Sequence, residues 1–422
     1  MRYIKMLFSV CLVVQLVSAQ QDFSGYFNGD KLRLDYTIRG TKHGCSVSAD
    51  SIYREANWGG SVINTIDTFL YGEMLLEVFD SVGNKLIYSR GYSSLFKEWQ
   101  TTPEADSVER EFGGSVVMPF PEHPVRIDIS ERNYDLSFGK IFSLYINPDH
   151  SGMKEKVRFR TILYNGLPAN KLDIVFLSEG YREDDSTKFF SDVRKKSDEL
   201  FQWEPYSAYR SSFNIYAVFV PTERTTEDAT ENAVKPETAF GVKFNTFGSQ
   251  RYLSAEHISK VRDAVSGIPY DQICIVVNSQ KYGGGGIYNF LTLFTSDNEY
   301  SEFLFHHEFG HGFASLADEY YSSVVPYESL FDLNYEPYQP NITPRVDFSR
   351  KWHDLIPDTV PVPTPNIELY RSVTGLFEGA GYSPKGVYRP YYNCSMKSRS
   401  KNAFCPVCRR AIEQMIRFYT AE

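Results

Sequence analysis

The chain has 422 residues, of which 42% are hydrophobic and 23% charged, a balance typical of a globular protein with two or three domains. Its formal net charge of -9 argues against nucleic acid as a partner, because nucleic acid selects a basic protein face. No segment after residue 19 holds about 18 uninterrupted apolar residues, so we expect no transmembrane segment in the mature chain.

Residues 1–19 have the pattern of a signal peptide. A short basic region with Arg2 and Lys5 precedes an apolar run over 6–17, and a small-x-small pattern ends at Ala19. Cleavage is therefore predicted after Ala19, and the mature protein is expected to be secreted, periplasmic or exported to the cell surface.

Residues 20–150 predict an all-β domain. Polar and apolar residues alternate with period two, and turn-forming Gly, Asn and Pro separate the runs, a pattern typical of a β-sandwich. This domain shows no chemical constellation, so we expect a packing or binding module. The expected strands lie at 31–36, 72–80, 85–90, 121–127 and 138–147.

Residues 151–422 predict a second domain with a mixed or parallel sheet. Buried strands are expected at 171–180, 213–220 and 272–278, and helices at 184–200 and 255–266. Strands that alternate with helices favour an α/β (or α+β) architecture.

The next helix carries the motif His307-Glu308-Phe309-Gly310-His311, one copy of H-E-x-x-H. Residues four apart lie on one helix face, so His307 and His311 can bind the same Zn²⁺. Glu308 lies one step round the helix, where its carboxylate can act as base toward water at the metal. His306 is excluded as a ligand, because the residue four positions after it is Gly310.

The third ligand is left open by the motif. The longer metzincin pattern would place it at Ala317, which cannot bind a metal. Asp318, one residue later, is the first candidate, provided that the helix ends soon after His311; Gly312 would permit such an end. The alternatives are the neighbouring Glu319 and two later carboxylates, Glu328 and Glu336.

Four glycines at 283–286 precede the motif helix. No Lys-Ser/Thr follows them, so they do not form a P-loop. They form either a flexible loop or an edge beside the metal, where Gly284, Gly285 and Gly286 let a peptide backbone approach and pair as an added strand along 283–295.

Downstream, Tyr388 and Arg389 are candidates to stabilise an oxyanion. Met396 is either a core methionine or the methionine of a tight turn beneath the zinc. Cys405 and Cys408 form a C-x-x-C near Cys394. These cysteines predict either a disulfide from Cys394 to Cys405 or Cys408, ahead of a last helix at 408–419, or part of a structural zinc site with His353.

The combined motifs resemble the IgA-peptidase family M64 of secreted bacterial metallopeptidases, of the type found in Bacteroides. The resemblance rests on the segments 172–181, 307–320, 394–396 and 404–408. It implies a metzincin-like zinc peptidase domain behind an N-terminal β-sandwich, with His307, His311 and Asp318 as ligands and Glu308 as base. It does not imply that immunoglobulin A is the substrate.

We therefore expect an exported, monomeric zinc endopeptidase with Zn²⁺ as cofactor and a protein or peptide as substrate. The alternative is a catalytically silent surface binding protein or adhesin that retains a zincin fold. The intact Glu308 favours the enzyme, because a silent protein need not keep its base.

Overall fold

The computed structural model of the protein describes residues 23–133, 135–223, 238–321, 331–399 and 403–420. The predicted signal peptide and the alternative ligand Glu328 lie outside these residues. None of the described helices is both long enough and apolar enough to cross a membrane.

The N-terminal region is a sandwich of two four-stranded sheets, as predicted. Alternate residues of facing strands fill its core, such as Leu32 and Leu34 of one sheet and Met74 and Leu76 of the other. One short helix, α1 (Leu95–Trp99), lies against the second domain. The first sheet has the order β5 (Arg110–Pro121), β1 (Phe27–Thr41), β2 (Gly44–Glu55) and β8 (Gly152–Met153), and the second has β4 (Leu86–Tyr92), β3 (Met74–Asp80), β6 (Val125–Arg132) and β7 (Phe138–Ile146).

The second domain is built on a six-stranded mixed sheet, which confirms the predicted sheet type. Four central strands are parallel, and the strand at each edge is antiparallel to its neighbour. In order, the strands are β15 (Gly284–Ile287), β16 (Leu291–Thr295), β14 (Gln272–Val277), β10 (Leu172–Glu179), β11 (Phe213–Val218) and β9 (Arg160–Leu163).

The central strand β10 is buried on both faces. Ile174 and Phe176 pack toward a layer of helices made of α2 (Ser186–Leu200), α4 (Ser301–Ala314) and α5 (Pro406–Thr420). Val175 and Leu177 pack on the opposite face, in the core that includes α3 (Ile258–Asp263). Burial on both faces explains why the middle of β10, residues 174–177, is an uninterrupted apolar run in the sequence.

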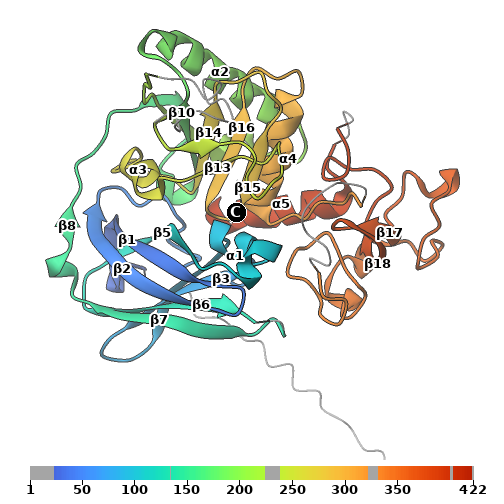
Figure 1. Ribbon diagram of the computed structural model, residues 1–422, viewed down its shortest axis with the longest axis horizontal. Helices are drawn as coiled ribbons and strands as arrows, with labels where there is room; N and C mark the ends of the chain where they lie inside the picture. Colours follow the sequence, from blue (N-terminus) through green and yellow to red (C-terminus); the bar gives the residue numbers. More distant parts are fainter. Residues whose placement is uncertain (1–22, 134, 224–237, 322–330, 400–402, 421–422) are drawn as a thin grey trace, which may run out of the picture.

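The helix predicted at 255–266 is shorter in the structure. Its first predicted residue, Ala255, belongs instead to β13 (Ser254–Ala255), which pairs with β12 (Val242–Lys243). The loop-rich segment that carries the hairpin of β17 (Phe377–Ala380) and β18 (Ser383–Arg389) lies to one side of the sheet (Figure 1).

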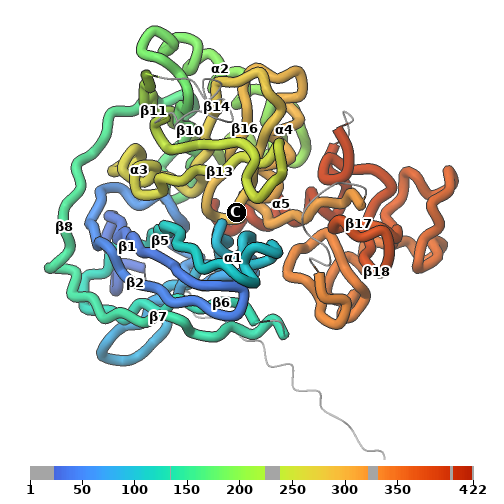
Figure 2. Tube along the Cα trace, in the orientation of Figure 1, coloured from blue at the N-terminus to red at the C-terminus, as the bar shows by residue number. Residues whose placement is uncertain are grey.

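The sandwich and the sheet domain share an extensive interface. Arg33 of β1 is buried and binds Asp263 at the end of α3, with 2.7 Å between Nη1 and Oδ1. Arg90 of β4 donates to the hydroxyl of Tyr419 in α5 (2.7 Å). Figure 2 shows the connection between the two domains running along the outside of the molecule past β8. The interface therefore depends on side chains from both domains, and it fixes the cleft described below.

Candidate metal centre

The motif helix α4 is held by an aromatic face. Phe305, Phe309 and Phe313, spaced four residues apart, are fully buried, and the ring of Phe305 lies 4.6 Å from that of Phe294 in β16. This packing turns His307 and His311 away from the sheet core and into a cleft. His306 instead packs on Trp203, and its Nδ1 lies 2.8 Å from the carbonyl of Glu302, which agrees with its exclusion as a ligand.

Three ligand atoms converge at the cleft. Oδ1 of Asp318 lies 3.0 Å from Nε2 of His307 and 3.3 Å from Nε2 of His311, and the two Nε2 atoms are 3.2 Å apart. In a tetrahedral zinc site, bond lengths of about 2.0–2.2 Å place ligand atoms roughly 3.3–3.6 Å apart. The three atoms, 3.0–3.3 Å apart, lie close to this spacing, and all three residues line the cleft.

Backbone carbonyls orient both imidazoles. Nδ1 of His307 donates to the carbonyl of Ser395 (3.0 Å), and Nδ1 of His311 donates to the carbonyl of Leu316 (2.5 Å). A carbonyl can only accept, so Nδ1 carries a hydrogen in each ring, and Nε2 is the atom left to face a metal ion. Such outer partners fix the tautomer and the ring orientation of metal-binding histidines.

Asp318 reaches the histidines because the chain turns sharply after α4. The helix ends at Ala314, and Ser315 adopts a left-handed conformation with φ of 55°. Gly312 is still helical, so it does not end the helix as expected. It is required for packing instead: a Cβ there would lie 2.3 Å from Oγ1 of Thr292 in β16.

The charge distribution at Asp318 favours a cation. Its Oδ2 accepts from the hydroxyl of Tyr382, whereas the buried Oδ1 faces the two imidazoles. Burial opposes ionisation of Asp318, but the two imidazoles outweigh it and hold the pKa of this carboxyl well below its usual range. Burial likewise opposes charge on His311, but Asp318 raises the pKa of His311 to about 9.

The other candidates for the third ligand lie elsewhere. Glu319 points into a cluster of cysteines, described below. Glu336 accepts from the backbone N–H of Asp347 (2.9 Å) and lies 3.7 Å from Nζ of Lys351. Of the described candidates, only Asp318 faces both histidines.

Glu308 faces the same cleft and rests on β15. A Cβ on Gly284 would lie 2.6 Å from Oε1 of Glu308, so the strand and the carboxylate are in close contact. Burial raises the pKa of Glu308 above its usual range. A raised pKa suits a group that takes up a proton and then gives it away.

The glycine run forms the edge strand β15, but most of the backbone groups on its outer side already have hydrogen-bond partners. Hydrogen bonds alternate along an antiparallel pair, so the backbone groups of Gly284 and Gly286 point away from β16 and those of Gly285 point toward it. At Gly284, the N–H donates to Arg251 (3.0 Å) and the carbonyl accepts from Leu253 (2.9 Å). Within the described part of the chain, Gly286 alone keeps an unpaired outward edge at the cleft.

Tyr388 and Arg389, the predicted oxyanion donors, do not reach the cleft. Both lie in β18, where the backbone of Tyr388 pairs with Thr343. Arg389 is fully buried and donates to the carbonyls of Glu378 (2.8 Å) and Gly379 (2.6 Å). The hairpin of β17 and β18 uses both residues for its own packing.

Met396 lies beneath the motif helix. Its sulfur would be 3.0 Å from a Cβ on Gly310, so Gly310 makes room for it. Its carbonyl accepts from the N–H of Glu319 (2.8 Å), next to Asp318. The turn thus supports the helix and the third ligand together.

The cleft has a volume of about 720 Å³ and is lined by residues of both the sandwich and the second domain. One wall comes from the sandwich, where the sequence shows no chemical pattern; it includes Glu73 and Glu98. Tyr252 donates a hydrogen bond to Glu98, and Tyr338 donates one to Glu73. Of the tyrosines that line the cleft, only Tyr320 could have been predicted from the sequence, because it directly follows the segment 316–319 of the extended motif. The tyrosines that line the cleft are Tyr252, Tyr282, Tyr288, Tyr320, Tyr335, Tyr338 and Tyr382.

Comparison with known proteins agrees with these observations. The model of the family described as IgA peptidase M64 matches residues 161–371 and 366–416, and the model described as the peptidase M64 N-terminus matches residues 22–143. No curated protein sequence matches the chain. The first family model covers more than half of the chain, including α4, the three converging ligands and Cys394, Cys405 and Cys408. The protein therefore belongs to the M64 family of IgA peptidases, as its motifs predict.

Proposed function

We propose that the protein is a zinc-dependent endopeptidase with a metzincin-like site. The observation that carries the proposal is the convergence of His307 Nε2, His311 Nε2 and the buried Asp318 Oδ1 at distances of 3.0–3.3 Å. The turn after α4 and the methionine beneath it support the likeness to metzincins.

When bound, zinc would supply Lewis acidity and lower the pKa of a water molecule to about 7. Glu308 would accept a proton from the attacking water on its carboxylate and deliver it to the nitrogen of the leaving amine. His307, His311 and Asp318 would hold the ion. Tyr320, whose hydroxyl accepts from Arg251 (2.8 Å), replaces Tyr388 as the candidate donor to the oxyanion, because it lines the cleft.

The substrate backbone would pair with β15 at Gly286. The outward N–H and carbonyl of Gly286 can pair with one residue of an extended peptide. The segment 251–253 covers the neighbouring position, so this contact is short, and side-chain pockets in the cleft would supply most of the specificity. The sandwich would contribute to these pockets, because its residues Glu73 and Glu98 line the cleft.

The test compares wild type with Glu308→Gln for zinc content and for cleavage of a diverse peptide library. The variant should keep its zinc and lose cleavage. A matched control is Glu302→Gln, on the same helix, whose Oε1 accepts from Nε1 of Trp203 (3.0 Å) and can still do so as an amide. The control should cleave like wild type.

Zinc retained in both proteins without cleavage in either would overturn the endopeptidase and favour a silent binding protein. Equal cleavage in both proteins would exclude Glu308 as the base.

We also propose that the protein is exported. The support is the pattern of residues 1–19. N-terminal sequencing of the protein from its native host should begin after Ala19, and an intact N-terminus would contradict export by this route.

A further inference from the structure

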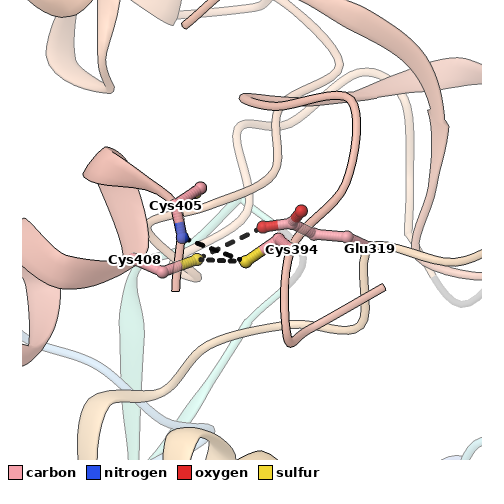
Figure 3. A group of neighbouring side chains, drawn as sticks. All are labelled: Glu319, Cys394, Cys405 and Cys408. Atoms are coloured by element: carbon pink, nitrogen blue, oxygen red, sulfur yellow. Dashed lines mark hydrogen bonds between the residues drawn. The ribbon is translucent and has the colours of Figure 1, made fainter. Parts of the chain in front are cut away.

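A second group of potential metal ligands lies behind the catalytic cleft. It consists of Cys394, Cys405, Cys408 and Glu319, and all four are buried. One ligand atom from each residue lies within 4.8 Å of the other three. The four come from three segments: the chain after α4, the turn before Met396 and the start of α5. Figure 3 shows Glu319, Cys394 and Cys408 facing one another.

The distances are those of metal ligands rather than of a disulfide. Sγ of Cys394 and Sγ of Cys408 are 3.8 Å apart, and all three cysteines are free. A disulfide would need about 2.0 Å between sulfurs. A tetrahedral zinc site with bonds near 2.3 Å places its sulfurs roughly 3.8 Å apart. The disulfides predicted from the sequence are therefore not formed in the structure.

The fourth member of the group is the carboxylate of Glu319, and not the imidazole of His353 that the sequence suggested. Oε1 of Glu319 lies 3.2 Å from Sγ of Cys408 and accepts from the amide of Asn341 (3.1 Å). Among the described residues, Oε2 of Glu319 has no hydrogen-bond partner, although the residue is fully buried. An ionised carboxylate that is buried beside three thiols, with one oxygen unpaired, is costly unless a cation is bound there.

The backbone around the cysteines also suits a metal thiolate. The N–H of Cys405 points at Sγ of Cys394 (3.3 Å). Pro406 begins α5, so Cys405 precedes the helix and Cys408 lies in its first turn. Arg389, which the sequence suggested for the catalytic site, interacts electrostatically with Glu319 instead and partly balances the negative charge of such a cluster.

We propose that Cys394, Cys405, Cys408 and Glu319 bind a second, structural zinc ion. The site is closed, because all four ligands come from the chain and all are buried. It would tie together the two segments that complete the catalytic site. Cys394 adjoins Ser395, whose carbonyl orients His307, and Glu319 adjoins Asp318.

The test measures zinc per chain in the full-length protein purified without reductant. Wild type should hold two zinc ions, His307→Ala one and Cys408→Ser one. The matched control is Cys45→Ser, which removes a half-buried cysteine of the sandwich and should leave two. After exchange of zinc for Co²⁺, His307→Ala should keep the sulfur-to-cobalt charge-transfer absorption, and Cys408→Ser should lose it.

His307→Ala leaves the cysteines untouched, so it remains informative if Cys408→Ser fails to fold. One zinc in wild type and none in His307→Ala would overturn the proposal. So would a disulfide among the three cysteines in a non-reduced peptide map. Failure of the endopeptidase proposal would leave the charge-transfer signal in place, so the two proposals fail separately.

Discussion

At the scale of single residues, the geometry of the site depends on a missing side chain as well as on the ligands. Gly284 has no side chain, and this allows the carboxylate of Glu308 to lie against β15. The sequence shows the glycines and the motif helix as separate features. Their contact could not be predicted, because it depends on how closely the strand approaches the helix.

Gly284→Ala should therefore impair the base without emptying the metal site. The new methyl group would lie 2.6 Å from Oε1 and 2.7 Å from Cγ of Glu308, so the carboxylate must move. A displacement near 1 Å costs about 100-fold in turnover. We expect kcat to fall by about that factor and zinc content to remain. Gly113→Ala, where a Cβ meets nothing within 4 Å, is the control. Unchanged kcat would show that Glu308 is not held by the strand.

Tyr382 should govern metal affinity through Asp318. Its hydroxyl donates to Oδ2 of Asp318, and burial raises its pKa well above the usual range, so the hydroxyl stays protonated. Tyr382→Phe should weaken zinc binding by about 10- to 100-fold, the usual effect of losing such an outer partner. Competition with a chromophoric chelator measures this. Tyr145→Phe, at a 69% exposed side chain, should bind zinc like wild type.

At the scale of elements, the sequence predicted three of the four central strands and the motif helix well, because their signals are local; it did not predict β16. β10 has an apolar run at 174–177, and α4 combines a helical spacing with buried aromatics. β15 and the end of α4 were less predictable. The edge pairing of β15 comes from residues 251–253, and the turn at Ser315 depends on a left-handed residue that is not glycine.

β10 carries a buried acid at its end, and this makes stability depend on pH. Burial raises the pKa of Glu179 from 4.5 to about 7, against hydrogen bonds that include one from the N–H of Phe240 (3.0 Å). Between these pH values the unfolded chain has lost this proton and the folded chain keeps it. The free energy of unfolding therefore falls as pH rises from 4.5 to about 7, by roughly 3 kcal/mol from this group.

Glu179→Gln should remove that part of the slope. Urea unfolding across this pH range measures it as the difference between wild type and variant. Glu183→Gln, at an exposed position four residues later, should leave the slope as it is in wild type. A difference that stays constant from pH 4.5 to 7 would show that Glu179 is ionised in the folded protein.

At the scale of the whole molecule, the sandwich is part of the site. Glu73, just before β3, and Glu98 of α1 both line the cleft. The sequence predicted two domains and assigned the chemistry to the second. It could not predict the shared wall, because contacts between domains join residues far apart in the chain and leave no periodic pattern.

The interface should make the two domains unfold together. Arg33 is 1% exposed and joins Asp35 and Glu55 of the sandwich to Asp263 of the sheet domain. Arg33→Met would remove the partner of Asp35 and leave Glu55 with Lys31 alone (3.4 Å), so the cost should approach that of breaking a buried ion pair, about 3–5 kcal/mol. We expect one calorimetric transition, shifted as a whole to lower temperature. Arg39→Met, on the same strand but with a 57% exposed side chain, should shift it little. Two transitions, of which only one responds to Arg33→Met, would contradict this expectation. The sandwich would then be only loosely attached to the sheet domain, and its residues in the cleft could move away from the metal centre.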